Sequence, residues 1–579
     1  MKILLIAPES YYLPVGLAFI SAALKRGGHQ VDTCYIGQQD EFLGRQGDRY
    51  DFIATGGMSS QLHIMRAVRD IARDYGCKFV CGGPIISADP LTMARLIQPD
   101  FAVVGEGETT ILDLFKCLES GAGLEVVQGI IYQKDGDFVK TPERVDFSPI
   151  DAISRPDLDG FGFTERLDRA RPFDVYYLDL FDNPRDYPLI TSRTCPFSCT
   201  FCFQPENRKY RVRDLDDVID ELRDVVFRYR INVVTIVDEL FHAKNSRLIE
   251  FCEKFKTFRE TVPWDLRWSC QARVAHMTEE LLDKMRDSGC FMISYGIESY
   301  SETVLKSMRK NIKPDMIDTV IPATLRRGIS VQGNFIFGDT AETLDTAQET
   351  LDYWRAHPEY GIVLYHLLPV PGSAIYHLAR KKGLLPDLDD FLINRYFAPQ
   401  NLTSMRYLDY MEMRRRVLQH ELLYTKWQAP IHISRTSVEV RCSHCSAVNH
   451  YQNCENNPLF FHTMTYCRSC RLRYFIGSAP YRAYAQIVGQ MVFHVYFYIA
   501  YLHAFPLLRA AYRSVRRLFR GDWGERKTAV SRGLAVAAAS SPEAGATTAI
   551  PLRELASSRR RGSIDVKAMR EASRIESNV

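Results

Sequence analysis

Short apolar segments alternate with amphipathic stretches along the first 385 residues of the chain, and this alternation limits the fold more than any other sequence feature. Apolar runs of about four to eight residues, bounded by glycine or proline, are typical of buried parallel strands. The stretches between them have a helical period: in one of them Asp214 is a suitable N-cap, and Val218, Leu222 and Val225 recur on one face. The pattern predicts an α/β protein with parallel sheets.

The alternation falls into two groups, which we interpret as two domains, and the first group covers residues 1–120. Its predicted strands are 2–7, 52–55, 78–83 and 101–108. Glycines follow three of these strands, as Gly56-Gly57, Gly82-Gly83 and Gly105. In doubly wound sheets ligands bind at the carboxyl ends of the strands, where glycine lets the backbone approach closely. We therefore predict a Rossmann-like domain with a ligand face at these glycines; the alternative is that they only make tight turns.

The second group covers residues 187–385 and contains six strand–helix units. Its predicted strands are 188–192, 233–237, 266–271, 291–298, 331–338 and 362–368. Six consecutive units favour an open, partial (β/α)6 barrel. Its working face would lie at the carboxyl ends of the strands.

Five further regions complete the predicted organisation. They are a connector with a β-hairpin at 121–186, a helical connector at 386–435, a second cysteine cluster at 436–476, an apolar and then basic helix at 477–524, and a tail at 525–579. Asp135-Gly136 is the predicted turn of the hairpin. The tail is rich in Ala, Ser and Arg and has few large apolar residues, so we expect it to be disordered.

Three cysteines lie just after the first predicted barrel strand, in the stretch TCPFSCTFCF. Cys195, Cys199 and Cys202 have the spacing C-x3-C-x2-C, which brings three thiolates onto one short loop. They can bind three irons of a 4Fe–4S cluster and leave the fourth iron open, as a catalytic metal keeps one position free. The alternatives are free thiols, or a structural cluster with a fourth ligand from elsewhere. The cysteines available as that ligand are Cys252, Cys270 and Cys290.

This loop, with an aromatic residue before its last cysteine, resembles that of the radical S-adenosylmethionine (SAM) superfamily. The resemblance continues through VDELF, SCQARV, YGIES and LPVPGS and covers about residues 187–380. It implies an iron–sulfur cluster on the three cysteines, whose open iron binds SAM. One-electron reduction then cleaves SAM to a 5′-deoxyadenosyl radical, so a donor such as flavodoxin or ferredoxin is an expected partner.

The same resemblance implies side chains that contact SAM. Phe201 is expected near the adenine, and Glu298, at the end of the fourth strand, as a further contact. Gln271 and Arg273, at the end of the third strand, are additional candidates, for which an ion pair that braces the barrel is the alternative. The stretch IFGDTAET departs from the family's Gly-x-Pro-Gly-Glu-Thr loop at Ala341.

The first 120 residues are similar to the cobalamin-binding domain that precedes many radical SAM barrels, in LPVGLAFISAALKRGGHQV, CGGP and VVGEGETTILDL. The positions that this similarity assigns to the cofactor are Ser60, Gly82, Gly83, Gly105 and Glu106. The histidine of the signature Asp-x-His-x-x-Gly is missing from APESYYLPVG, so cobalamin is expected without a histidine axial ligand. Its lower face would be open, bound to water, or next to Tyr11 or Tyr12. A Rossmann-like domain that binds no cobalamin is the alternative.

Cobalamin beside a radical SAM cluster implies a class B methyltransferase. One SAM methylates cob(I)alamin, a second generates the radical, and the substrate carbon then takes the methyl group. The first alternative is an oxidoreductase or cyclase resembling the anaerobic Mg-protoporphyrin ester cyclase. The second is a methylthiotransferase, which would need three clustered cysteines in the first domain, and the third is a non-enzymatic scaffold. No motif identifies the substrate, which we expect to be a small molecule or lipid-like.

Four more cysteines form two C-x2-C pairs separated by 21 residues: Cys442, Cys445, Cys467 and Cys470. Two such pairs are a strong signal of a zinc ribbon, in which four thiolates close the metal site and make it structural. A second iron–sulfur cluster on the same thiolates is the alternative. The spare ligand candidates nearby are His444, Cys454 and His462.

Residues 483–508 contain no Asp, Glu, Lys or Arg and are long enough to span a bilayer. Five arginines follow between Arg509 and Arg520, and a single crossing from the cytoplasm would export them against the positive-inside rule. We therefore predict an interfacial or protein-packed helix, with a membrane surface as a candidate partner.

Charge and cysteine usage bear on location and partners. The formal net charge of +3 is small for 579 residues, so we expect no nucleic-acid partner. The 15 cysteines are an odd number and seven of them fall in the two clusters, which favours metal-bound thiolates in a reducing cytoplasm over disulfides. We predict a cytoplasmic protein, peripheral on the inner face of the membrane if the apolar helix binds there.

Overall fold

The computed structural model describes residues 1–504 apart from short internal segments, with the backbone alone for 492–504. The segments outside this description are 10–11, 45–48, 146–148, 151–152, 154, 175–179, 204–208, 242, 276 and 386. Three sequence predictions lie outside the described residues: the proximity of Tyr11 to the cofactor, the arginine-rich stretch, and the disordered tail.

The amino-terminal sheet has seven strands in the order β2-β1-β3-β4-β5-β6-β7. They are β1 (Lys2–Ala7), β2 (Gln30–Tyr35), β3 (Phe52–Gly56), β4 (Lys78–Gly82), β5 (Phe101–Val103), β6 (Ile130–Lys134) and β7 (Asp137–Lys140). The helices between them are α1 (Val15–Arg26), α2 (Asp40–Leu43), α3 (Leu62–Asp74), α4 (Pro84–Ala88), α5 (Pro90–Ile97) and α6 (Gly107–Ser120). β1 to β5 run parallel, and alternate side chains face opposite helix layers: Leu5 belongs to the core with α1 and α6, and Ile6 to the core with α3 and α5.

The predicted hairpin forms and extends this sheet beyond residue 120. β6 and β7 pair antiparallel, and β6 also pairs with β5. Asp135 and Gly136 both have positive φ, 53° and 90°, as a two-residue hairpin turn of the primed type requires.

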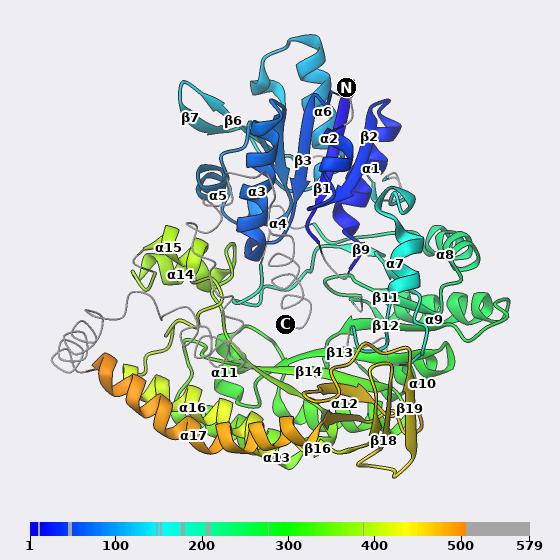
Figure 1. Ribbon diagram of the computed structural model, residues 1–579, viewed down its shortest axis with the longest axis vertical. Helices are drawn as coiled ribbons and strands as arrows, with labels where there is room; N and C mark the ends of the chain where they lie inside the picture. Colours follow the sequence, from blue (N-terminus) through cyan, green and yellow to red (C-terminus); the bar gives the residue numbers. More distant parts are fainter. Residues whose placement is uncertain are drawn as a thin grey trace.

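The six-stranded sheet has the order β15-β14-β13-β12-β11-β8, and all its strands are parallel. They are β8 (Asp186–Leu189), β11 (Val233–Ile236), β12 (Arg267–Ala272), β13 (Cys290–Glu298), β14 (Ser330–Phe337) and β15 (Val363–His366). The helices of this region are α7 (Phe163–Arg169), α8 (Leu215–Tyr229), α9 (Asn245–Arg259), α10 (Glu279–Asp287), α11 (Glu302–Ser307), α12 (Pro314–Arg326), α13 (Leu344–Ala356) and α14 (Ala374–Lys381). Since spatial order follows chain order, each unit packs beside the preceding one, below the amino-terminal sheet in Figure 1.

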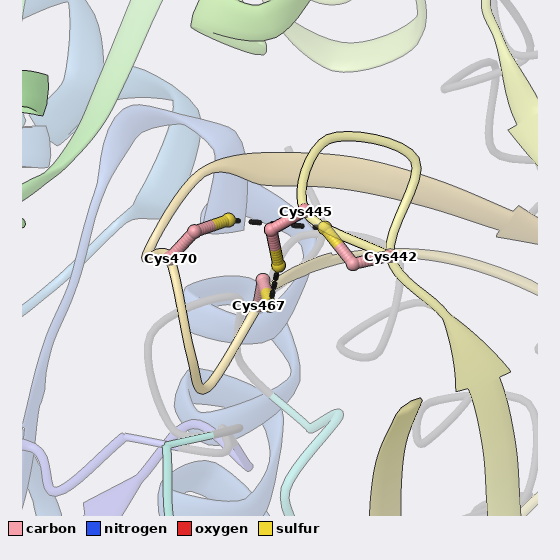
Figure 2. A group of neighbouring side chains, drawn as sticks. All are labelled: Cys442, Cys445, Cys467 and Cys470. Atoms are coloured by element: carbon pink, nitrogen blue, oxygen red, sulfur yellow. Dashed lines mark hydrogen bonds between the residues drawn. The ribbon is translucent and has the colours of Figure 1, made fainter. Parts of the chain in front are cut away.

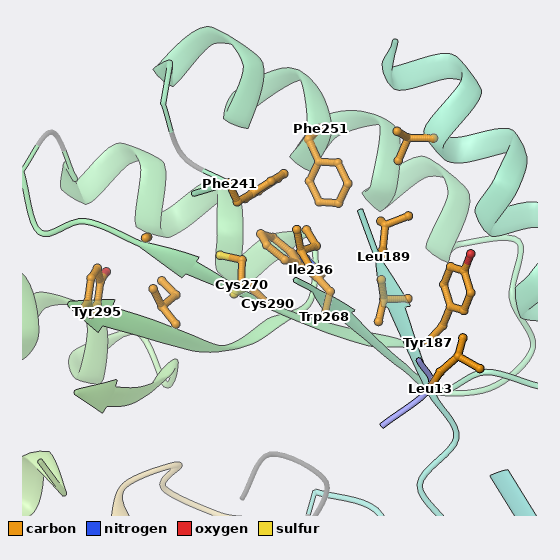
Figure 3. Close-up of a cluster of buried hydrophobic side chains, with 14 of the residues drawn as sticks. Leu13, Tyr187, Leu189, Ile236, Phe241, Phe251, Trp268, Cys270, Cys290 and Tyr295 are labelled. Atoms are coloured by element: carbon orange, nitrogen blue, oxygen red, sulfur yellow. The ribbon is translucent and has the colours of Figure 1, made fainter. Parts of the chain in front are cut away.

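Helix α8 shows how local sequence produces these units. The Asp214 side chain accepts hydrogen bonds from the backbone N–H groups of Asp216 and Asp217, which confirms the predicted N-cap. Val218 and Leu222 are fully buried against the sheet. The core behind the strands is aromatic, with Trp268 packed edge-on against Phe251 (Figure 3).

The carboxyl-terminal region contains two small sheets and three helices. The strands are β16 (Trp427–Gln428), β17 (Pro430–Ile433), β18 (Ser437–Arg441), β19 (Val448–Gln452), β20 (His462–Tyr466) and β21 (Arg473–Gly477), and the helices are α15 (Leu388–Asn394), α16 (Tyr407–Tyr424) and α17 (Ala479–Ala504). α17 lies along α16 (Figure 1), and a Cβ on Gly489 would lie 2.5 Å from Leu423 Cδ2. The apolar helix is thus packed on protein over its first turns. Within the described residues, no helix is both long and apolar enough to cross a membrane.

Candidate active site

The cysteine loop begins at the carboxyl end of the first strand of the six-stranded sheet. β9 (Ser192–Arg193) pairs antiparallel with β10 (Arg211–Val212) and closes the base of the loop. Asp238, from the VDELF stretch after β11, accepts hydrogen bonds from Thr191 N and Ser192 Oγ, both at 2.7 Å. Because this carboxylate is buried and supplied with donors, it fixes where the loop starts.

The middle of the loop is held by two helices. Thr200 N donates to the carbonyl of Met308, just after α11, at 3.1 Å. Ile375 N, in the first turn of α14, donates to the Thr200 carbonyl at 2.9 Å. Backbone hydrogen bonds on both sides therefore set the position of the loop without using its thiols.

The three thiols of the loop differ in exposure: Cys199 is buried, Cys195 half-buried and Cys202 exposed. Their sulfur atoms are not gathered within 4.8 Å of one another, as ligands of a single ion would be. Ligands of three different irons stand farther apart, so this arrangement fits the three-cysteine side of a 4Fe–4S cluster.

Charges around Cys199 favour its thiolate. A hydrogen bond from Cys202 is the main cause that lowers the pKa of Cys199 to about 6; burial opposes this shift, and the cations Lys310 and Arg273 support it. Arg273 Nη1 lies 3.9 Å from Cys199 Sγ, and its guanidinium carbon lies 3.9 Å from the centre of the Phe197 ring. The thiolate is the form that binds metal, so the surroundings of Cys199 suit iron ligation. Burial raises the pKa of Cys195, and the hydrogen bond to Cys199 raises the pKa of Cys202.

The two candidates at the end of the third strand lie in different surroundings. Arg273 is buried, and its Nη2 donates to the carbonyl of Lys310. Its described partners are a sulfur, a ring and a carbonyl rather than the carboxylate of a bracing ion pair. Gln271 is exposed on the strand face opposite Cys270 and Ala272, which belong to the core. SAM contact by either residue remains a prediction.

Glu298 ends β13 in a buried ion pair that the sequence did not indicate. Its Oε1 lies 2.6 Å from Lys310 Nζ, and the two side chains are 7% and 8% exposed. Glu298 has a φ of 59°, and the pairing with β14 shifts register between Gly296 and Glu298. A Cβ on Gly296 would lie 2.4 Å from Lys310 Nζ, so glycine leaves the room that this pair occupies.

Sequence reasoning missed Lys310. It follows α11 in the stretch RKNIKP, where basic residues are ordinary and no local pattern marks one of them as buried. Its Nζ also lies 5.9 Å from the centre of the Phe201 ring. One buried ammonium group therefore adjoins both Phe201 and Glu298, the two residues predicted most directly to contact SAM.

Both acidic side chains of the IFGDTAET loop accept hydrogen bonds from donors in or next to the loop. Asp339 Oδ1 accepts from Ala341 N at 2.9 Å, and Glu342 accepts from Gly338 N at 3.2 Å and from Thr346 Oγ1 at 2.7 Å. Burial raises the pKa of Glu342 to about 7. Both carboxyl groups are turned into the loop, so they stabilise its shape.

The predicted ligand face of the amino-terminal sheet contains two kinds of glycine. A Cβ on Gly83 would lie 3.0 Å from Gly57 N, so these two loops need glycine for their mutual approach, as the tight-turn alternative holds. Gly105 has a φ of 77°, and a Cβ there would meet nothing within 4 Å. Its backbone therefore borders open space, and contact of Gly105 with cobalamin remains a prediction. Gly82 ends β4, and Ser60, in the 3₁₀ turn Ser59–Gln61, is half-buried near this edge.

Two other predicted cofactor neighbours contact the six-stranded region. Tyr12 packs against a buried cluster that includes Val233 and Met292. Glu106 is ion-paired with Arg193 and Arg211 from the β9–β10 hairpin. Cofactor binding by either residue remains a prediction.

The two regions meet at their ligand-binding ends. Gly372, in LPVPGS, has a φ of 80°, and a Cβ there would lie 2.7 Å from Phe203 Cδ2 and 3.1 Å from Ala88 Cα. Phe203 directly follows Cys202, and Ala88 ends α4 of the amino-terminal sheet. The cysteine loop is therefore packed beside the edge that carries the glycine face.

The second cysteine cluster forms a compact four-thiol group (Figure 2). Cys442, Cys445, Cys467 and Cys470 place their sulfur atoms within 4.8 Å of one another, the one such group in the part of the chain that the structure describes. Backbone N–H groups of His444 and Ser469 donate to Cys442 and Cys467 at 3.3 and 3.4 Å. The donor set and its spacing suit a closed, four-coordinate ion. The spare candidates His444, Cys454 and His462 are not members of the group.

Cysteines elsewhere are poorly placed to supply a fourth ligand to the loop. Cys270 and Cys290 lie among the aromatic and aliphatic side chains between the sheet and its helices (Figure 3), and Cys252 is buried on α9 in the same core. Burial raises the pKa of Cys252 to about 12, which disfavours the thiolate that iron would need.

Comparison with known proteins agrees with this geometry. The model of the Radical SAM superfamily matches residues 189–353, and that of the B12 binding domain matches residues 1–115. An uncharacterized methyltransferase of Pyrococcus horikoshii is 26% identical over 409 residues, which cover 66% of this chain and 84% of that protein. The anaerobic magnesium-protoporphyrin IX monomethyl ester cyclase of Rubrivivax gelatinosus is 27% identical over 359 residues, covering 58% and 61%.

Solved structures share the fold at low sequence identity. The cobalamin-dependent SAM radical enzyme OxsB, with aqua-cobalamin and SAM bound, matches with a TM-score of 0.59 and 17% identity, over 73% of this chain and 66% of that one. A likeness at this identity supports the arrangement of domains alone. The two family models agree with the cysteine loop and the glycines after the strands, and we conclude that the chain contains a radical SAM domain and a B12-binding domain.

Proposed function

We propose that this protein is a cobalamin-dependent radical SAM methyltransferase that transfers a methyl group to an unactivated carbon. The observation that carries the proposal is the packing of a three-cysteine loop beside the ligand edge of a B12-binding domain. When bound, the 4Fe–4S cluster, SAM and cobalamin supply hydrogen abstraction and the methyl group. The substrate would be a small or lipid-like molecule that binds between the two domains.

The residues of this chain would bind and orient these groups. Cys195, Cys199 and Cys202 would hold three irons, and the Arg273 guanidinium would support the Cys199 thiolate through its contact with that sulfur. Glu298 and Lys310 would bind the polar end of SAM at the end of β13. The close approach of Gly372 to Phe203 and, across the domains, to Ala88 would exclude water, which protects a reactive radical from side reactions.

The finer architecture belongs to the same proposal. The six parallel strands would form a partial barrel open toward the B12-binding domain, and the four-thiol group would be a zinc ribbon. All 15 cysteines lie within the described residues and none of them forms a disulfide, which suits a reducing cytoplasm with a ferredoxin or flavodoxin as electron donor. The packing of α17 on α16 supports the protein-packed form of the apolar helix over a membrane role.

Metal analysis of the protein and one matched pair of variants test whether the four-thiol group binds zinc. Cys467→Ser is expected to lose one zinc ion per chain and to lower the unfolding temperature, because a closed structural site stabilises the fold through its ligands. Cys454→Ser, a buried neighbour outside the group, should keep the ion. When the loop cysteines are also replaced, elemental analysis identifies the metal on the four-thiol group. Iron retained there would contradict zinc.

Product mass tests the reaction. Anaerobically reconstituted protein given reductant, hydroxocobalamin and SAM with a deuterated methyl group is expected to produce 5′-deoxyadenosine and one metabolite that gains a labelled methyl group. Mass spectrometry of extracts before and after incubation detects both. An oxidised or ring-closed product without label would instead favour the cyclase alternative, which the similarity to the Rubrivivax enzyme keeps open.

The methylthiotransferase alternative lacks its second cluster. The amino-terminal cysteines Cys34, Cys77, Cys81 and Cys117 do not form a metal-binding group among the described residues. Three of them are buried in the hydrophobic cores of the amino-terminal domain. A scaffold role is tested by the loop variants described in the Discussion.

A further inference from the structure

A network of two glutamates and two arginines joins the B12-binding domain to the base of the cysteine loop. Glu106 and Glu108 lie at the start of α6, directly after β5, and Arg193 and Arg211 are paired in the β9–β10 hairpin. Arg193 Nη1 lies 3.0 Å from Glu106 Oε2 and 3.2 Å from Glu108 Oε2, and Arg211 also pairs with Glu106. A single guanidinium group therefore holds two carboxylates of the other domain.

This network is shielded from solvent. The side chains of Arg193 and Glu108 are 16% and 12% exposed, and those of Arg211 and Glu106 are 11% and 24% exposed. Bidentate arginine–carboxylate pairs have a fixed geometry, and burial removes the screening that makes surface pairs weak. A network of this kind can define the position of one segment against another, which a flexible surface pair cannot do.

Each side of the network is anchored close to a predicted cofactor. On the B12-binding side, Gly107 separates the two glutamates and is pressed on α1, since a Cβ there would lie 2.7 Å from Ile20 Cδ1. Gly105, whose backbone borders open space, directly precedes Glu106 and donates from its N–H to Ser87 Oγ at 2.8 Å. The segment that contains Gly105 is thus also the segment whose two glutamates hold Arg193.

On the other side, Arg193 is followed by Thr194 and then by Cys195. Thr194 has a φ of 63°, a left-handed conformation that a β-branched residue adopts only when its surroundings impose it. The guanidinium carbon of Arg193 also lies 5.5 Å from the centre of the Phe19 ring on α1. Because Arg193 is fixed on the B12-binding domain, the backbone that leads into the first cluster cysteine is fixed there too.

We propose that Arg193, held by Glu106 and Glu108, is a positioning residue that sets the distance and orientation between the iron–sulfur cluster and the corrinoid. This role rests on the proposed function, because it presumes that both cofactors bind. In this proposal Glu106 aligns the two domains and does not contact the cofactor directly. Small displacements between reacting centres lower the reaction rate strongly, so a fixed arrangement of the two domains matters for transfer between two cofactors.

The test measures the distance between the two cofactors directly. Holoenzyme loaded with the cluster and cobalamin is reduced so that both centres are paramagnetic, and pulsed electron paramagnetic resonance gives the distribution of distances between them. The native protein is expected to give one narrow distribution. Arg193→Gln and Glu108→Gln should broaden or shift it while iron and corrinoid contents stay as in the native protein, and Glu108→Asp should restore part of the native distribution.

The matched control is an exposed ion pair between the B12-binding domain and α15, away from the cysteine loop. Arg95 and Asp389 pair at 2.7 Å but are 56% and 43% exposed, so Asp389→Asn should leave the distance distribution unchanged. An unchanged distribution in both Arg193→Gln and Glu108→Gln would overturn the positioning role alone. A native protein that takes up no corrinoid would overturn the proposed function and this role together. Far-ultraviolet circular dichroism confirms that each variant is folded, and Glu108→Gln carries the test if Arg193→Gln is not.

Discussion

Replacement of Cys195, Cys199 and Cys202 by alanine is expected to abolish iron binding by the loop and to reduce 5′-deoxyadenosine formation to background. The loop is held by Asp238 and by backbone hydrogen bonds of Thr200, none of which uses a thiol. The fold should therefore survive the loss of all three sulfurs. Iron and sulfide analysis, the spectrum of the reduced cluster and mass spectrometry of deoxyadenosine measure the outcome.

The control for this variant is a cysteine in the core. Cys270→Ala removes a buried thiol behind the sheet, outside the loop, and should retain both iron and SAM cleavage. Iron that persists in the triple variant with undiminished SAM cleavage would contradict the assignment of the cluster to this loop. A protein whose cellular role is unaffected by the triple replacement would be a scaffold rather than an enzyme.

Replacement of Lys310 by methionine is expected to be the most destabilising single change near the active site. It leaves the Glu298 carboxylate buried without its ammonium partner, and breaking one side of a buried pair costs about 3–5 kcal/mol. The free energy of unfolding in urea, measured on protein without cofactors, tests this. SAM affinity, measured by calorimetry on the reconstituted protein, should also fall, because Lys310 adjoins both Glu298 and Phe201.

A second variant separates stability from binding. Lys310→Met combined with Glu298→Gln removes both charges and should recover much of the lost stability, because no unpaired charge remains buried. It should not recover SAM affinity. Lys306→Met, an exposed lysine one turn earlier on α11, is the matched control and should change neither quantity. Full SAM affinity in the double variant would show that the pair only braces the sheet.

Much of the fold follows from local pattern. The six strands of the second sheet form within a few residues of their predicted positions, because apolar runs and glycine or proline boundaries are local signals. The N-cap at Asp214 and the turn at Asp135-Gly136 also form as predicted, since each depends on a few neighbouring residues. The hairpin's partner was not predictable in this way, because its pairing with β5 depends on contacts distant in sequence.

In the active site, too, features that depend on a short segment were predictable and features that depend on distant residues were not. The spacing of Cys195, Cys199 and Cys202 is enough to predict an iron–sulfur loop, because one short segment holds all three ligands. Lys310 and Arg193 were missed because no local pattern marks either side chain as buried or identifies its carboxylate partner. Lys310 meets Glu298 twelve residues away through a register shift in β13, and Arg193 meets Glu106 across 87 residues and two domains.

The sequence by itself determined the thiol spacing of the two cysteine clusters and the alternation that builds the parallel strands of the two large sheets. Thiol spacing and hydrophobic period are properties of short segments, so folding does not change what they specify. Only the tertiary structure decided which buried charges surround the loop and how it is registered against the B12-binding domain. Those features depend on the desolvation and pairing of side chains from separate elements, and burial of that kind exists only after the elements have packed.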